Sequence, residues 1–284
     1  MSVPYVPFPR YENILVAGDT AAEVLGALKI YAKGLVGGEI PSMELLHPAE
    51  KPLECISCML ADPKAVFAHA VKKIGADYVL LEDNGIKDFN PVAAKETFEA
   101  QGIKVKVLDV KGDVEDVLRR AGAMFGEARQ AERVITERRK RLEALKGYPV
   151  TKNLRGVFLL GIRSPIKHES YVFSVAPHSG LNALLKEAFG TDNLLRTGPE
   201  KDMIEGVQEL GDIGDLIALR PDFIALTGDA AACEKVLREY FKEHPEKKKE
   251  MEGNGTRVIA APYFCHCLAW RSDVILEAWA DALG

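Results

Sequence analysis

The segment from Asn13 to Ala32, NILVAGDTAAEVLGALKIYA, decides the fold. It opens with a short apolar run, NILVAG, which is typical of a buried strand. After the small-residue turn at Gly18, the stretch AAEVLGALKIYA has the apolar spacing of a helix. A strand that feeds a helix through such a turn is the start of an α/β unit.

The same alternation continues through the first 112 residues. Helical patterns occur at 62–76 and 91–102, and buried-strand patterns occur at 77–84 and 103–110. Strands that alternate with helices of this length predict a mostly parallel sheet. We therefore expect an N-terminal α/β lobe over residues 1–112.

A long segment without proline follows this first lobe. From Asp113 to about Lys146, apolar side chains recur with helical spacing and alternate with Lys, Arg and acidic residues. The pattern predicts one helix over 113–147, about 50 Å long, with a solvated outer face.

The alternation of strand and helix resumes over residues 148–284. Strand patterns occur at 155–162, 223–228 and 257–264, and helical patterns include 179–190 and 272–283. The polar run EHPEKKKEMEGNG at 243–255 is interpreted as a surface loop or helix end. The fold class expected is therefore α/β, with two lobes of mostly parallel sheet joined by one long helix.

Composition narrows the possible partners. The chain has 284 residues, 47% of them hydrophobic, and its 37 Lys and Arg against 42 Asp and Glu give a net charge of -5. This balance does not favour nucleic acid as a partner. No apolar run reaches the roughly 20 residues that span a bilayer, and MSVPYVPFPRYEN at the start lacks the pattern of a signal peptide.

Candidate ligand contacts follow from the expected sheets, because ligands of open α/β sheets sit beyond the carboxyl ends of the strands. A loop over 163–180 also gathers an arginine, two histidines and a tyrosine, which suit an anionic or metal-containing ligand. Aromatic residues near the last strand would supply apolar walls. The ligand-binding residues predicted in this way are Asp19, Thr20, Asp83, Asn84, Arg163, His168, Tyr171, His178, Thr227, Tyr263 and Trp270.

The cysteines leave three alternatives open. Cys55 and Cys58 form a CxxC pair, and Cys265, His266 and Cys267 form a C-H-C triplet. Together they could ligate a soft or borderline metal, if the fold brings them together. Cys55 and Cys58 could instead form a disulfide or redox pair, or the thiols could all be unreactive. Cys233, within a helical pattern, is expected to be a small buried residue.

Several phrases occur in the order found in one known family. They are Asp19–Glu23, Gly26–Leu28 and Gly34–Gly38 in the first lobe, and SGLNALLKEAFGTDNLL (179–195) and DLIALRPDFI (215–224) in the second. In these phrases the chain resembles the single-helix-hinged solute-binding proteins of ABC importers, which carry iron-siderophores, haem, cobalamin or metal ions. The resemblance covers nearly the whole chain and implies a ligand cleft between the two lobes.

The resemblance also implies a function and partners. It implies capture of a metal chelate by a monomer that needs no cofactor and performs no catalysis. Glu23, and less clearly Glu187, match acidic residues that dock onto the importer's permease. The compartment would be periplasmic, or extracytoplasmic with a membrane anchor, if a signal has been removed, and cytoplasmic otherwise.

An enzyme is the competing hypothesis. A cysteine/histidine metalloprotein or a chelatase-like enzyme on a related two-lobed fold would use the thiols and His266 around a reactive metal. The sequence contains no HExxH, no GxSxG and no P-loop, so it lacks these catalytic and nucleotide-binding motifs.

Overall fold

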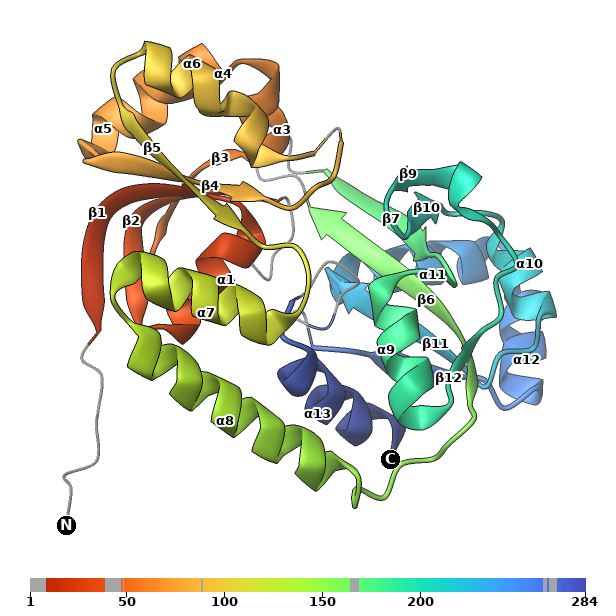
Figure 1. Ribbon diagram of the computed structural model, residues 1–284. Helices are drawn as coiled ribbons and strands as arrows, with labels where there is room; N and C mark the ends of the chain where they lie inside the picture. Colours follow the sequence, from red (N-terminus) through yellow and green to blue (C-terminus); the bar gives the residue numbers. More distant parts are fainter. Residues whose placement is uncertain are drawn as a thin grey trace. The chain divides into compact units, whose positions relative to one another are not determined.

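The computed structural model describes residues 9–38, 47, 49–87, 89–163, 169–262, 265 and 270–284. Two compact units share the chain: unit 1 contains the described residues up to Lys140, and unit 2 contains Arg141–Gly284. Each unit is an α/β layer structure built on its own sheet (Figure 1). Within the described residues, no helix combines the length and the apolar character needed to cross a membrane.

Unit 1 contains a fully parallel five-stranded sheet in the order β3-β2-β1-β4-β5. The strands are β1 (Arg10–Ala17), β2 (Ile30–Gly37), β3 (Lys51–Cys55), β4 (Tyr78–Asp83) and β5 (Lys104–Asp109). The chain passes from β1 to β2 on one side, whereas β4 lies on the other side of β1. The strand order therefore reverses beside β1, which is where open α/β sheets form a ligand crevice.

Helices cover both faces of this sheet (Figure 1). One face packs on α3 (Ile56–Ala61), α4 (Pro63–Val66), η1 (Phe67–Val71), α5 (Lys72–Ile74), η2 (Pro91–Ala94) and α6 (Lys95–Ala100). The other face carries α1 (Asp19–Ala27) and α7 (Val114–Phe125). The helix predicted to reach Ala32 ends at Ala27, because Lys29 takes a left-handed φ of 62° and Ile30 begins β2.

The single helix predicted over 113–147 is two helices. α7 ends at Gly126, which takes φ 73° and whose N–H donates to the carbonyl of Gly122, and α8 (Ala128–Leu145) follows. The left-handed conformation at Gly126 ends α7, as glycine commonly does at helix C-termini. A Cβ at Gly122 would lie 2.8 Å from the Cβ of Ala131, so the two helices approach closely at their junction. The element that leads into unit 2 is therefore α8 alone.

Unit 2 contains a seven-stranded mixed sheet in the order β12-β11-β6-β7-β10-β9, with β8 paired to β6. The parallel strands are β6 (Arg155–Arg163), β8 (Asp192–Asn193), β11 (Phe223–Gly228) and β12 (Arg257–Ala260). β7 (Ser170–Val175) runs antiparallel to β6, and β10 (Val207–Glu209) and β9 (Asp202–Ile204) extend that antiparallel side. Within the expected loop over 163–180, residues 170–175 therefore form a strand.

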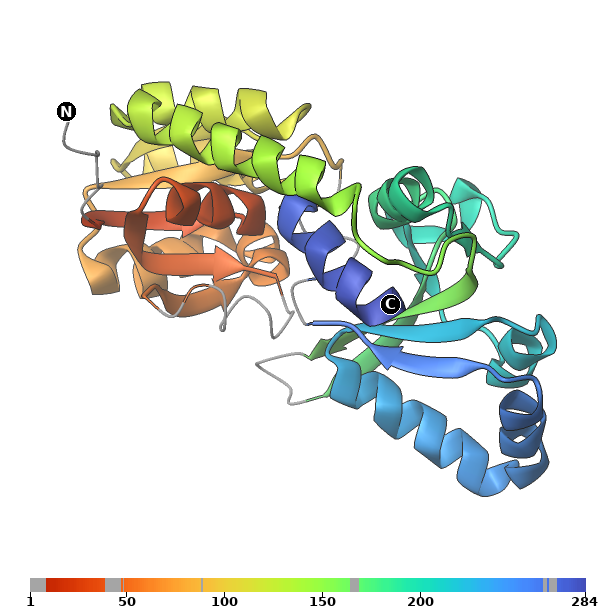
Figure 2. The same ribbon diagram turned by 90° about the horizontal axis from the view of Figure 1, so that it is seen from below.

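Helices cover both faces of the unit 2 sheet (Figure 2), and an apolar layer lies on each face. One layer packs under α9 (Gly180–Phe189) and α13 (Ser272–Leu283), around Phe158 and Trp279. The other packs under α10 (Ile213–Ala218), α11 (Ala230–Glu243) and α12 (Pro245–Gly253). A short η3 (Pro199–Lys201) precedes β9.

The segment interpreted as a surface loop or helix end over 243–255 forms the helix α12. Pro245 occupies its first turn, where a missing N–H costs nothing. Lys247 pairs with Glu250 at 2.9 Å and Lys248 with Glu252 at 3.7 Å along the exposed side, while Met251 is buried against the core. Ion pairs at helical spacing on the exposed side and the buried Met251 on the other side favour a helix here.

Candidate functional site

The carboxyl ends of the unit 1 strands form the candidate site of that unit. All five strands are parallel, so their last residues, Ala17, Gly37, Cys55, Asp83 and Asp109, meet at one edge of the sheet. The predicted residues lie at this edge: Asp19 and Thr20 begin α1, Asp83 ends β4, and Asn84 follows it. The structure thus brings these four predictions to one edge, which we call the unit 1 edge.

Asp19 lies at the start of α1, where the strand order reverses. Gly18 supplies the preceding turn with φ 123°. The N–H of Gly38, after β2, donates to Asp19 Oδ1 at 2.8 Å and to Oδ2 at 3.0 Å. Burial raises the pKa of Asp19 to about 6, although the hydrogen bond from Gly38 acts in the opposite direction. The carboxyl group is therefore held in place and its charge is disfavoured.

Glu82 is a second carboxyl group at this edge, and sequence reasoning missed it. It is 4% exposed; Oε2 accepts from the N–H of Ala21 at 2.8 Å, and Oε1 accepts from Asn84 Nδ2 at 3.1 Å. Burial, with a smaller effect of the charge on Asp19, raises its pKa to about 7 against these hydrogen bonds. Two coupled carboxyl groups with raised pKa values therefore flank the reversal of strand order.

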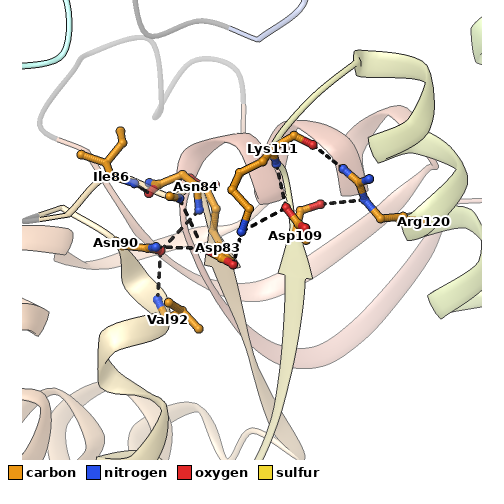
Figure 3. A network of polar contacts seen from close by, with 10 residues as sticks. Asp83, Asn84, Ile86, Asn90, Val92, Asp109, Lys111 and Arg120 are labelled. Atoms are coloured by element: carbon orange, nitrogen blue, oxygen red, sulfur yellow. Dashed lines mark hydrogen bonds and ion pairs between the residues drawn. The ribbon is translucent and has the colours of Figure 1, made fainter.

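The ends of β4 and β5 are joined by a polar network (Figure 3). Asp83 Oδ1 accepts from Asn90 Nδ2 at 2.8 Å, and Asp83 Oδ2 pairs with Lys111. Lys111 Nζ also lies 3.4 Å from Asp109 Oδ1, and Arg120 from α7 donates to the carbonyls of Asp109 and Lys111. The hydrogen bonds from Lys111 and Asn90 lower the pKa of Asp83.

The side chain of Asn84 makes three hydrogen bonds in the same network. Its Nδ2 donates to Glu82 Oε1 and, at 3.1 Å, to the carbonyl of Phe89, while its Oδ1 accepts from the N–H of Ile86 at 2.9 Å. All three of these hydrogen bonds are made with other residues of unit 1 (Figure 3). Asp83 and Asn84 shape this edge, and a ligand would meet groups that are already fixed.

Cys55 and Cys58 end β3 and begin α3 at the same edge, and they are joined by a disulfide. This is one of the alternatives that the sequence left open. In this form neither sulfur is a thiolate, which is the form that ligates metals. A role for Cys55 and Cys58 as metal ligands would require the disulfide to be reduced.

Arg163 and Tyr171 lie at the corresponding edge of the unit 2 sheet. β6, β11 and β12 end there, and β7 begins there because Ser170 pairs with Arg163 in an antiparallel register. Arg163 Nη2 lies 3.1 Å from Oδ2 of Asp229, which is 6% exposed and caps α11 through the N–H of Ala232. Tyr171 is 38% exposed and stacks on Phe173. Because Tyr171 pairs with Ile162 and Ser170 pairs with Arg163, the ring and the guanidinium lie on opposite faces of the sheet at this unit 2 edge.

His178 does not belong to this edge, although the sequence placed it with Arg163. It follows the far end of β7, and five residues at about 3.3 Å each separate Ser170 from Val175 by roughly 16 Å. His178 Nε2 lies 2.7 Å from Asp202 Oδ2 in β9. The pKa of Asp202 would rise with burial, but hydrogen bonds from His178, Gly206 and Gln208 lower it overall. His178 is separated from Arg163 because β7 runs antiparallel to β6.

Thr227 does not fit a ligand contact either. It lies within β11, is fully buried, and donates its hydroxyl to the carbonyl of Leu159 at 2.8 Å. The side chain satisfies its hydrogen bond inside the sheet. The prediction treated Thr227 as a residue that follows the strand, whereas β11 continues to Gly228.

Cys265 lies in the apolar core of unit 2, and the described residues around it form no metal site. It is 0% exposed and belongs to the cluster around Phe158 and Trp279. Burial raises the pKa of its thiol to about 12, so the thiolate form that binds metal is disfavoured. Cys233 is likewise fully buried, which confirms its predicted place.

Four predicted residues, His168, Tyr263, His266 and Cys267, lie outside the described residues. Trp270 is partly buried, and its Nε1 has no hydrogen-bond partner within the described part of the chain. Across the same described ranges, no three His, Cys, Asp or Glu side chains are grouped so that they could hold a metal ion. The two predicted docking residues lie on helices, with Glu23 half-buried on α1 and Glu187 exposed on α9.

The sequence matches no family model and no curated protein. Solved structures share its fold. A periplasmic heme-binding protein from Pseudomonas aeruginosa is 17% identical with a TM-score of 0.61, over 97% of this chain and 92% of that one. The periplasmic heme-binding protein RhuT from Roseiflexus sp. RS-1, in its apo form, is 13% identical with a TM-score of 0.64, over 96% of this chain and all of that one.

A siderophore-binding protein shares the fold as well. FhuD from Vibrio cholerae, bound to Fe3+-Desferal, is 13% identical with a TM-score of 0.57, over 95% of this chain and 97% of that chain. These similarities extend over nearly the full length of each chain. The fold is therefore the one that these heme- and siderophore-binding proteins share, as the sequence phrases indicated.

Proposed function

We propose that this chain is the solute-binding component of an ABC importer and that it captures haem or an iron-siderophore. The observation that carries the proposal is the near full-length similarity of fold to binding proteins for both kinds of ligand. Binding requires no covalent step, so no catalytic group and no resident cofactor belong to the proposal. The metal arrives with the ligand.

The side chains of the two edges support this kind of ligand. Haem and many siderophores carry anionic groups, and the guanidinium of Arg163, whose side chain is 55% exposed, can donate two parallel hydrogen bonds to a carboxylate. Tyr171 offers an aromatic surface at the same edge, on the other face of the sheet. In unit 1, the raised pKa values of Asp19 and Glu82 reduce the negative charge that an anionic ligand would meet.

The finer parts of the proposal concern partners and compartment. A monomer would dock onto the permease through Glu23 and Glu187, as the family resemblance implies. An extracytoplasmic location, after removal of a signal, is supported by the Cys55–Cys58 disulfide, because disulfides persist in oxidising compartments. The cysteine/histidine enzyme is not proposed, since Cys265 is a core residue and Cys55 and Cys58 are joined to each other.

A fluorescence titration tests the proposal. The protein has two tryptophans, Trp270 and Trp279, whose emission haem or a ferric siderophore would quench on binding. We expect saturable binding of one of the two ligands, and weaker binding of its iron-free form. Linear, non-saturating quenching by both ligands would contradict the proposal. The cobalamin expected from the resemblance is a useful third ligand in the same titration.

A further inference from the structure

The Cys55–Cys58 disulfide differs from the other described cysteines in its exposure. Cys58 is partly exposed at the first turn of α3, whereas Cys55 is 3% exposed and Cys233 and Cys265 are both 0% exposed. Cys58 is therefore the more exposed of the two disulfide residues, and a thiol in solution would approach from its side. Access of this kind is a condition for thiol–disulfide exchange.

Stability gives little reason for a disulfide at this position. In the chain-entropy view, a cross-link stabilises a fold less when the loop that it closes is shorter, and this loop spans only a CxxC motif. The junction of β3 and α3 is already anchored by Ile56 and Met59, which are 3% and 0% exposed in the apolar cluster of unit 1. The fold is thus held at this point without the covalent bond.

The two sulfur atoms of the disulfide have different environments. The backbone N–H of Cys58 donates a hydrogen bond to Cys55 Sγ at 3.0 Å. This bond would stabilise negative charge on Cys55 Sγ, and a better stabilised thiolate leaves faster in exchange. The arrangement therefore favours attack at the accessible Cys58 Sγ with Cys55 Sγ as the leaving group.

We propose that Cys55–Cys58 is a redox-exchange site that accepts two electrons from a dithiol reductant. One thiolate of the reductant attacks Cys58 Sγ, the bond between the cysteine sulfurs breaks, and Cys55 Sγ leaves as a thiolate that then takes a proton. The second thiol of the reductant loses its proton and attacks the reductant's first sulfur, the one bonded to Cys58 Sγ in the mixed disulfide. The Cys58 thiolate is released and takes a proton. The protein gains two thiols and the reductant becomes a disulfide.

The test treats the native, full-length protein with millimolar dithiothreitol, blocks free thiols with iodoacetamide, and assigns each cysteine by peptide mass mapping. We expect Cys55 and Cys58 to be reduced while circular dichroism shows an intact fold and while Cys233 and Cys265 stay unmodified. A disulfide that is reduced only after denaturant unfolds the protein would overturn the proposal.

A second measurement tests which sulfur is attacked and needs no substitution at either cysteine. Reduced glutathione, a monothiol, should leave its mixed disulfide on Cys58 in preference to Cys55, by on the order of tenfold or more. Equal adducts on both cysteines, or a preference for Cys55, would contradict the assigned roles. The paired variants Cys55→Ser and Cys58→Ser extend the test, because only the first should leave a rapidly alkylated thiol at this site.

Discussion

The carboxyl edges of the two sheets differ in what they present, although both units begin from the same alternation of strand and helix. The unit 1 edge receives five parallel strands and carries the partly buried Asp19 and the buried Glu82, two carboxyl groups whose charge is disfavoured. The unit 2 edge receives three parallel strands and the start of an antiparallel one, and presents Arg163 on one face of the sheet and Tyr171 on the other.

The difference teaches that the direction of one strand decides which side chains share an edge. Because β7 runs back along β6, it keeps Tyr171 at the same edge as Arg163 and carries His178 to the opposite edge. In unit 1, with every strand parallel, each turn after a strand contributes to a single edge. The predictions below test the two edges and the units that carry them, from the largest expected effect to the smallest.

The substitution Gly161→Ala should destabilise unit 2 most. A Cβ at Gly161 would lie 2.0 Å from the carbonyl oxygen of Asp229, and this neighbour is backbone that cannot turn aside. We expect a loss of about 4 kcal/mol in the free energy of unfolding, at the upper end for single substitutions. Urea denaturation followed by circular dichroism measures it.

Gly26→Ala, in the interior of α1, is the matched control for this substitution. A Cβ there would meet nothing within 4 Å, so the variant should be as stable as the parent protein or slightly more stable. If Gly161→Ala proved as stable as Gly26→Ala, the result would contradict the close approach of β6 to the start of α11.

The carboxyl pair of unit 1 should make stability depend on pH. Burial raises the pKa of Asp19 from 3.8 to about 6 and that of Glu82 from 4.5 to about 7, so the folded state binds these protons more tightly than the unfolded state. The free energy of unfolding should therefore fall as the pH rises from about 4 to 7, with Glu82 contributing on the order of 3 kcal/mol.

Glu82→Gln removes one titrating group while keeping the shape of the side chain, and should flatten much of this decline. Urea unfolding at several pH values compares the variant with the parent protein and with Glu187→Gln on the exposed surface of α9. An unchanged pH profile in Glu82→Gln would show that Glu82 is not the group responsible.

Arg163→Ala should weaken the binding of haem or a ferric siderophore. The loss of a charged donor at the unit 2 edge should raise the Kd by about tenfold, the effect of a charge-assisted hydrogen bond. Arg257→Ala is the control, because this exposed arginine begins β12 and lies at the opposite edge of the same sheet. Equal Kd values for the two variants would exclude the unit 2 edge as a ligand contact.

Lys111→Met should have the smallest effect. Lys111 joins Asp83 and Asp109 on the surface of unit 1, and exposed ion pairs contribute little in water (Figure 3). We expect a slightly lower Tm at low salt and no difference at molar salt, where such pairs are screened. A difference that persisted at high salt would indicate that the network stabilises the edge by packing.

The sequence was sufficient to predict the α/β class and the positions of Asp19, Asp83 and Asn84, because apolar periodicity and strand ends are local properties. The break between α7 and α8 also had a local signal, since Gly126 follows an amphipathic run. Pro245 and the charge spacing after it could have indicated α12.

Other features depend on contacts that are distant in sequence. Glu82 is a single acid near the end of an apolar strand, and its environment comes from the N–H groups of α1. The reversed direction of β7 arises from its pairing with β6 and β10, and apolar alternation is the same for either direction. The burial of Cys265 likewise depends on α9 and α13 packing around it.

Native mass spectrometry of the protein after incubation with haem or a ferric siderophore, set beside its denatured mass, tests the central claim most directly. A solute-binding protein should show one added ligand mass under native conditions, lost on denaturation, with the Cys55–Cys58 disulfide still present. Identical native and denatured masses with every ligand offered would contradict the proposed function.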